Sequence, residues 1–223
     1  MEKLKGESNN LSQFIYQKLR RRLIVGDLSP NDSLSIRTLA KNFGVSTMPV
    51  REALKRLETE NALTGSAKRA YRVPDISSQE AANIIFVRAT LEGAGTGLAI
   101  KHIRAPEIER LRQFSNAMDD AWKEQDAHGF LLNNFYFHSL IYRLTHNADL
   151  SEIVDALYAR SGPWLGKAIR EVAKIEDWVT EHHDIVNAIE ARDAPRVRAL
   201  IEADAAWGIT YFMNSDKLSN LVS

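Results

Sequence analysis

Six polar or ionisable side chains in the second half of the chain fall on helical stripes that are otherwise apolar. His138, for example, follows Asn134 by four residues, so both lie on one helical face with apolar neighbours. The full set comprises Arg88, Asn134, His138, Arg160, His182 and Asp204. Burying such groups is costly unless they are paired, hydrated or bound to a ligand. We therefore expect the six side chains to line one polar cavity.

Two binding chemistries suit this cavity. Its arginines and histidines favour a small organic acid, whose carboxylate a guanidinium can hold bidentately. Four of the six groups could also bind a divalent metal, because imidazole and carboxylate are ordinary metal ligands. This second set is Asn134, His138, His182 and Asp204. A structural alternative stays open, namely an Arg88–Asp204 salt bridge with both histidines satisfied by backbone carbonyls.

Six helical segments are expected to build the cavity. After Pro74 and Asp75 the sequence shows long helical periods without strand signals. The segments are residues 78–102, 106–125, 127–146, 149–172, 175–191 and 194–213, with Pro106 and Pro195 in first turns. Short connections between helices are typical of an antiparallel bundle, whose ligand sites form from side chains on facing helices.

The first third of the chain has a different charge. Residues 1–74 carry 14 Lys and Arg against 7 Asp and Glu, and the rest carries 15 against 22, so a net +7 offsets a net −7. A basic unit joined to an acidic body is typical of a polyanion-binding module. No cysteine is present, which excludes disulfides, and no apolar stretch reaches membrane-spanning length. We expect a cytoplasmic protein without a membrane partner.

The basic third has the spacing of a helix-turn-helix. A helix is expected over residues 11–25, and Ser35 can cap a second helix that runs through Phe43. Gly44 is placed to end that helix in a left-handed conformation. Ser46 or Thr47 can cap a third helix, which buries Val50, Ala53, Leu54 and Leu57.

The third helix leaves polar side chains free to contact DNA. In this motif the second helix of the pair enters the major groove, where Arg51 could bind guanine bidentately. Ser46 and Thr47 lie at a helix N-terminus, which favours a phosphate, and Arg37 is placed for the DNA backbone as well. Residues 63–67 and 70–73 predict two short strands around a basic tip, Lys68-Arg69, which would form a wing.

At this point the residues resemble the winged helix-turn-helix of GntR regulators. The resemblance is carried by Leu39-Ala40, Phe43-Gly44-Val45-Ser46, Pro49-Val50-Arg51-Glu52-Ala53-Leu54, Arg56-Leu57 and Asn61-Ala62-Leu63. It implies operator contacts from Arg37, Ser46, Thr47 and Arg51, with the wing tip at Lys68-Arg69. This chain departs from the family at two positions: the family usually has Arg where this chain has Thr47, and usually has Gly in the wing near Ala70. Both departures affect the expected base preference, but not the class of protein.

The later helices resemble the FCD ligand-binding domain, the helical partner of one GntR subfamily. Matching stretches include Val87-Arg88-Ala89-Thr90-Leu91-Glu92, Phe137-His138, His146-Asn147 and Ala188-Ile189. That family often binds a metal through an Asp-x-x-x-His pair and two later histidines. In this chain the residues at the pair are Asn134 and His138. His182 corresponds to the first of the two later histidines, and Asp204 stands where the family has the second. The resemblance implies a possible divalent metal of the zinc, nickel or manganese type, while Arg88 and Arg160 could hold an acid without one.

The sequence therefore predicts a mainly α protein with two domains. Residues 1–75 would form a winged helix-turn-helix of three helices and a small β-hairpin, and residues 76–223 an effector-binding and dimerisation bundle. We expect a homodimer on double-stranded operator DNA, controlled by a small organic acid. No catalytic residue is assigned, because no phosphate loop, zincin or nucleophile-elbow motif is present. Two alternatives stay open: a metal-dependent enzyme with a basic docking head, and an architectural nucleic-acid-binding protein without an effector.

Overall fold

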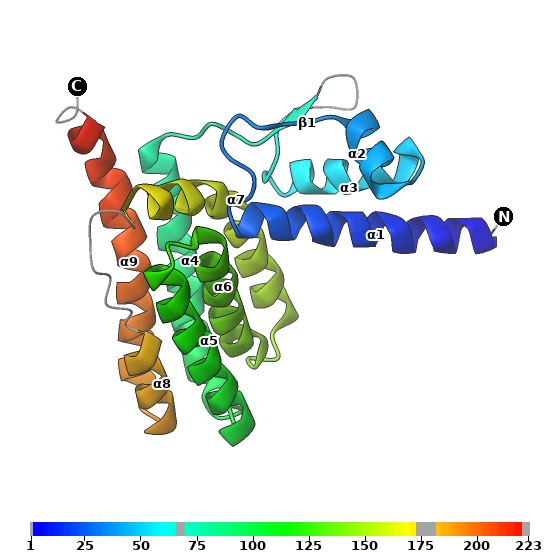
Figure 1. Ribbon diagram of the computed structural model, residues 1–223. Helices are drawn as coiled ribbons and strands as arrows, with labels where there is room; N and C mark the ends of the chain where they lie inside the picture. The colour runs from blue at the N-terminus through cyan, green and yellow to red at the C-terminus, as the bar shows by residue number, and fades with distance from the viewer. Residues whose placement is uncertain (1, 66–69, 173–181, 220–223) are drawn as a thin grey trace.

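The computed structural model describes residues 2–65, 70–172 and 182–219. In chain order its elements are α1 (Glu2–Ile24), β1 (Ser33–Leu34), α2 (Ile36–Phe43), α3 (Thr47–Thr59), β2 (Tyr71–Arg72), α4 (Ser78–Ala99), α5 (Ala105–Lys123), α6 (Ala127–Arg143), α7 (Ala148–Val172), α8 (His182–Glu190) and α9 (Ala194–Ser219). We call the elements from α1 to β2 the head and those from α4 to α9 the bundle. Figure 1 shows α1 extending away from the bundle, with α2 and α3 lying along it.

The head contains the expected three helices around an apolar core. Leu19, Leu54 and Leu57 are fully buried where α1 packs against α3. The predicted caps are confirmed: the Ser35 hydroxyl accepts a hydrogen bond from the Thr38 amide, and Gly44 ends α2 at φ 66°. Ser46 is the N-cap residue of α3, without a hydrogen bond from its side chain to the helix. The α2–α3 pair therefore has the geometry of a helix-turn-helix.

A small sheet follows the third helix. Thr64 and Arg72 exchange backbone hydrogen bonds of 2.8 Å, as expected for a hairpin. The sheet also includes β1, which pairs antiparallel with β2 in the register Ser33↔Arg72 and Leu34↔Tyr71. The sequence does not predict this extra strand, because two residues are too few to show an alternating pattern. Lys68 and Arg69, the predicted tip, lie outside the described residues.

The bundle helices begin and end close to their predicted bounds. Ser77 and Glu80 form a capping box at the start of α4, and Pro106 lies in the first turn of α5. The described part of the predicted helix 175–191 is α8, and α9 runs six residues past its predicted end to Ser219. α4 packs chiefly against α9 and α7, and α5 against α6. Within the described residues, no helix is long and apolar enough to cross a membrane.

Three glycines bring the head against the bundle. Gly26 follows α1 at φ 69°, and a Cβ on it would lie 2.7 Å from Cα of Gly166 on α7. A Cβ on Gly162, one turn earlier, would lie 2.2 Å from the Leu23 carbonyl oxygen. Arg170 adds a 3.2 Å hydrogen bond to the carbonyl of Gly26. The end of α1 therefore packs on α7 backbone to backbone.

Candidate functional site

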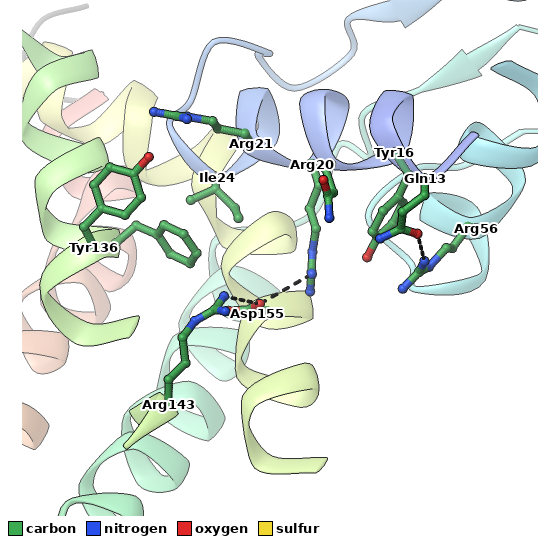
Figure 2. Close-up of a pocket in the computed structure, with 11 residues that line it drawn as sticks. Gln13, Tyr16, Arg20, Arg21, Ile24, Arg56, Tyr136, Arg143 and Asp155 are labelled. Atoms are coloured by element: carbon green, nitrogen blue, oxygen red, sulfur yellow. Dashed lines mark hydrogen bonds and ion pairs between the residues drawn. The ribbon is translucent and has the colours of Figure 1, made fainter. Parts of the chain in front are cut away.

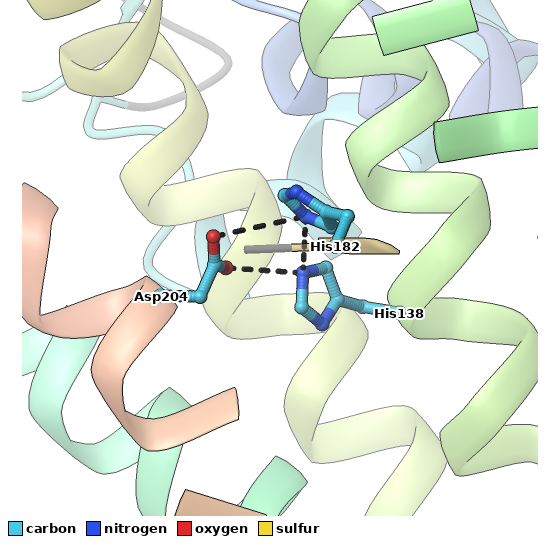
Figure 3. Close-up of side chains that lie close together, drawn as sticks. All are labelled: His138, His182 and Asp204. Carbon is cyan, nitrogen blue, oxygen red and sulfur yellow. Dashed lines mark hydrogen bonds and ion pairs between the residues drawn. The ribbon is translucent and has the colours of Figure 1, made fainter. Parts of the chain in front are cut away.

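Three helices of the bundle bring two histidines and an aspartate together. His138 lies on α6, His182 begins α8 and Asp204 lies on α9 (Figure 3). His138 Nε2 is 3.2 Å from Asp204 Oδ2 and 3.3 Å from His182 Nε2. His182 Nε2 is 3.7 Å from Asp204 Oδ1. Both imidazoles are buried and the carboxylate is 8% exposed, so this cluster lies inside the bundle.

Asn134, Arg88 and Glu92 extend the cluster. The Asn134 amide Nδ2 is 3.2 Å from His182 Nε2. Glu92 Oε2 lies between Arg88 Nε at 3.8 Å and His138 Nδ1 at 3.9 Å. Arg88 also donates to the Ser161 hydroxyl at 3.4 Å. Five of the six predicted residues therefore belong to one buried polar network.

Burial and neighbouring charges together shift the pKa values of His182 and Asp204. Burial lowers the pKa of His182 to about 4, although Asp204 opposes the shift, so the ring is neutral near pH 7. Burial alone would raise the pKa of Asp204, but the two imidazoles and Arg88 outweigh it and hold that pKa well below its usual value. Because His182 is neutral, we ascribe the shift mainly to the His138 hydrogen bond and Arg88. The aspartate is therefore ionised.

Several buried polar atoms in the network lack a hydrogen-bond partner among the described residues. Arg88 Nε and His182 Nδ1 are the clearest cases. Tyr158 Oη and Glu92 Oε1 also lack a hydrogen bond of good geometry, although Glu92 is close enough to raise the pKa of Tyr158. His182 Nε2 faces Asn134, His138 and Asp204, whereas its Nδ1 has no hydrogen-bond partner among the described residues. Buried polar groups are almost always satisfied, by water or a ligand where not by protein. These atoms are therefore ones that a buried water or a bound ligand could satisfy.

The donor set fits a divalent metal. One ligand atom from each of His138, His182 and Asp204 can be chosen so that all lie within 4.8 Å of one another. His138 Nε2 lies 3.3 Å from His182 Nε2 and 3.2 Å from Asp204 Oδ2, close to the roughly 3.0–3.5 Å between neighbouring ligand atoms around an ion with bonds of about 2.1 Å. The other carboxylate oxygen, Oδ1, lies 3.7 Å from His182 Nε2, so the two oxygens of Asp204 face different imidazoles. Rotating the Asn134 amide would present its oxygen to the same point. The cluster can thus hold a metal.

Arg160 is placed differently from the other five predicted residues. It is half-buried on α7, close enough to Glu80 to act on that carboxylate electrostatically. The face of α7 that is buried contains Val154, Tyr158 and Ser161. The apolar stripe on which the prediction rests includes Ile153, which is half exposed. Within the described residues, no contact between Arg160 and the cluster is found.

Sequence reasoning missed Glu92, Tyr158 and Ser161 as members of the network. Glu92 follows Arg88 by four residues and so lies on the same face of α4, a spacing that was available as a signal. The Arg88 guanidinium also lies 4.2 Å from the centre of the Tyr158 ring. The alternative Arg88–Asp204 salt bridge is absent from the described ion pairs; Arg88 pairs with Glu92, while Asp204 pairs with the histidines.

The head presents a separate surface of polar side chains. Arg37 at the start of α2 is exposed, as are Ser46, Thr47 and Arg51 at the start of α3. The opposite face of α3 is buried through Val50, Ala53, Leu54 and Leu57. Four of the six residues expected to contact DNA are therefore accessible, and the other two, Lys68 and Arg69, lie outside the described residues. This arrangement leaves the N-terminal part of α3 free to enter a groove.

Comparisons with known proteins agree with both parts of this description. The family described as "Bacterial regulatory proteins, gntR family" matches residues 11–73, and the FCD domain matches residues 83–205. The HTH-type transcriptional regulator McbR of Escherichia coli is 28% identical over 187 residues, which is 82% of this chain and 84% of that protein. The gluconate operon transcriptional repressor of Bacillus subtilis is 29% identical over 181 residues, 79% of this chain and 74% of that protein.

The fold comparison covers nearly the whole chain. The solved structure of E. coli McbR/YncC superposes with a TM-score of 0.81 at 24% identity, covering 92% of this chain and 98% of that one. These relatives are transcriptional regulators rather than enzymes. The chain belongs to the gntR family of bacterial regulatory proteins, as a DNA-binding transcriptional regulator whose C-terminal part is an effector-binding FCD domain.

Proposed function

We propose that residues 1–75 form the DNA-binding unit and that Arg51 reads base edges of the operator. The support is the exposure of Arg51 one turn into α3, on the face opposite the buried residues. A guanidinium there can bind guanine O6 and N7 together. Ser46, Thr47 and Arg37 contact phosphates and fix the register of α3 in the groove. The Lys68-Arg69 tip contributes a further backbone contact.

The test is an Arg51→Ala variant assayed on operators selected from a random DNA library by the wild type. We expect discrimination between operator and random DNA to fall by about 10- to 100-fold, corresponding to roughly 1–3 kcal/mol. Lys55→Ala is the control, because Lys55 is exposed one turn later and pairs with Glu58. It should weaken binding to all sequences alike, if at all. Full selectivity in Arg51→Ala would refute the assignment.

We propose further that the bundle binds a small carboxylic acid together with a divalent metal held by His138, His182 and Asp204, with Asn134 as an additional ligand. Charge supports the metal. Arg88 already faces two carboxylates, Glu92 and Asp204, and burial keeps His182 neutral, so neither group has positive charge to spare for an acid. A divalent ion adds positive charge and offers the acid a coordination position.

The ion is of the zinc, nickel or manganese type, since the donors are two imidazole nitrogens with a carboxylate. Arg88 supplies the second contact to the acid, through the Nε that lacks a hydrogen-bond partner among the described residues. Native mass spectrometry with elemental analysis of the purified protein tests both statements. A stoichiometric metal and a co-purified acid are expected. If the protein still binds acids with full affinity after a chelator has removed all metal, the proposed role of the metal is wrong.

We propose that the working unit is a homodimer. Support comes from large apolar side chains exposed on α4 and α7, including Phe86 at 63% and Ile153 at 50%. Contiguous exposed apolar surface commonly marks a protein interface. Phe86→Ser should therefore shift the mass measured by light scattering toward the monomer. Phe14→Ser, at a similarly exposed phenylalanine on the head, is the control and should leave the dimer intact. A dimeric Phe86→Ser would place the interface elsewhere.

A further inference from the structure

A cavity lies between the head and the bundle, away from the histidine cluster. It has a volume of about 370 Å³ and is lined from α1, α3, α6 and α7. Figure 2 shows Arg20 on α1 extending into it toward Asp155 and Arg143 on the bundle side, with Arg56 at the other end. This volume falls in the range of small-molecule sites. We call this cavity the junction cleft.

Positive charge dominates the junction cleft. Its lining includes four arginines, Arg20, Arg21, Arg56 and Arg143, but only Asp155 as a carboxylate. Arg56 is further paired with Glu60, with Arg56 Nε 3.3 Å from Glu60 Oε1. Counting Glu60 with the lining, four positive charges face two negative ones. Because guanidinium groups repel each other unless an anion separates them, the cleft is electrostatically incomplete.

Arg20 is the clearest sign of a missing partner. Its side chain is only 15% exposed, and its ion pair with Asp155 Oδ2 is long, at 3.5 Å. Asp155 is already engaged by the Tyr142 hydroxyl and, at 3.1 Å, by Arg143. Among the described residues, nothing accepts a hydrogen bond from Arg20 Nε or Nη2, and both atoms are buried. A buried charged donor without an acceptor is costly.

We infer that the junction cleft is a second ligand site, which takes a small molecule bearing a phosphate or carboxylate oxyanion and thereby ties the head to the bundle. The Arg20 side chain lines the cleft, and a small rotation of its guanidinium would turn the unpartnered Nε and Nη2 toward the oxyanion. Arg143 meets it from the bundle and Arg56 from the head. Planar guanidinium groups suit this role because they bind both oxyanions bidentately.

Aromatic rings fix the guanidinium groups at the walls. The Arg56 guanidinium lies 3.8 Å from the centre of the Tyr16 ring, and the Arg21 guanidinium 5.4 Å from that of Tyr136. Tyr16 in turn donates its hydroxyl to Glu60 at 2.7 Å. Arg56 belongs to α3, the helix whose first turn is proposed to contact DNA. Arg56 also donates to Gln13 at 2.7 Å. A ligand that spans the cleft from Arg143 to Arg56 would therefore hold α3 in one orientation relative to the bundle.

The experiment measures binding of inorganic phosphate and of malonate to the full chain by calorimetry at constant ionic strength. Arg143→Gln and Arg56→Gln should each weaken binding at least about ten-fold, the usual loss for a charged hydrogen bond. Both residues are roughly half exposed, so folding should tolerate the changes. Arg20→Gln should abolish saturable binding. Whichever probe binds more tightly identifies the oxyanion class.

Two control variants distinguish binding in the junction cleft from general attraction of anions to the head and from binding at the histidine cluster. Arg22→Gln removes an exposed arginine on α1 that does not line the cleft and should leave binding unchanged. His182→Gln disables the cluster in the bundle. It should remove only a separate component of malonate binding at that cluster, and should leave unchanged the component that Arg143→Gln weakens. The inference is wrong if neither probe binds saturably, or if Arg22→Gln weakens binding as much as Arg143→Gln. It is also wrong if His182→Gln is the one variant that weakens binding of the probes. A third contrary result would be an Arg143→Gln protein that binds random DNA more weakly but still binds phosphate as the wild type does.

Discussion

Replacing Gly162 with alanine tests the contact between head and bundle. Gly162 lies on α7, and a Cβ there would meet two backbone oxygens of α1, that of Leu23 at 2.2 Å and that of Ile24 at 2.6 Å. Neither oxygen can rotate away as a side-chain atom would. The added methyl group must therefore push the end of α1 off α7 by roughly an ångström, since non-bonded carbons approach to about 3.5 Å.

The expected change in unfolding free energy combines two opposing effects. Alanine in place of glycine within a helix stabilises by about 0.5–1 kcal/mol. Overpacking against fixed neighbours typically costs about 1–3 kcal/mol, and contacts this short favour the upper end. The net loss should be about 2 kcal/mol. For a chain of this size, that lowers the melting temperature by roughly 4–8 °C.

Gly97→Ala is the matched control. Gly97 also lies within a helix, α4, and a Cβ on it meets nothing within 4 Å in its own chain. Because Gly97 shares the exposed face of α4 with Phe86, the comparison is made in the Phe86→Ser background, where Gly97→Ala should be as stable as its parent or more so. Calorimetry compares the two melting temperatures. The chain has no cysteine, so cysteines can be introduced at Asn42 on the head and Gln113 on the bundle and spin-labelled. The distance between the two labels, measured in protein diluted with unlabelled chains, reports the separation of head and bundle. An unchanged distance and a melting temperature at or above wild type in Gly162→Ala would refute the packing argument.

Three further outcomes follow from the bundle. Arg88→Met leaves the Glu92 carboxylate buried without its cation and should lower the free energy of unfolding, measured with denaturant, by about 3–5 kcal/mol. The double variant with Glu92→Gln should recover much of that loss. No recovery would disprove the pairing. Removing metal with a chelator should lower the melting temperature of the wild type, because a ligand at 100 times its Kd stabilises the folded state by about 2.7 kcal/mol. The melting temperature of His182→Gln should not change. Equal shifts in both proteins would argue against the metal site. Ser77→Ala removes the capping box of α4 and should cost about 0.5–2 kcal/mol in thermal unfolding, and a change within error would show that packing against α9 alone fixes this helix.

Local signals in the sequence are sufficient to predict most of the fold. The caps at Ser35 and Gly44 act within one helical turn, so they hold whatever surrounds them. The strand at Ser33–Leu34 could not be predicted, because it exists only through its pairing with Tyr71 and Arg72 nearly forty residues later. The close packing of Gly26 on Gly166 is unpredictable for the same reason. Both features depend on long-range contacts.

The site is predictable where apolar periodicity is unambiguous. Periodicity favours His182 over His183 because His182 shares a face with Ile185 and Ile189, and the structure has His182 buried and His183 at 44% side-chain exposure. On α7 the same reasoning places Arg160 inward, because Ile153 and Trp164 suggest a buried stripe. Ile153 is instead exposed, and in the proposed dimer such a residue would contact a partner. Periodicity indicates an apolar face, but not which apolar surface covers it.

A short stretch of α7 connects the two candidate sites. Arg88 donates to Ser161, and the next residue, Gly162, packs on the backbone of Leu23 and Ile24 at the end of α1. Asp155, two turns earlier on the same helix, pairs with Arg20 in the junction cleft. An acid that draws Arg88 away from Ser161 therefore acts at the turn of α7 on which the head rests. Because these contacts are backbone to backbone, a small shift of α7 cannot be absorbed by side-chain rotation and must move α1.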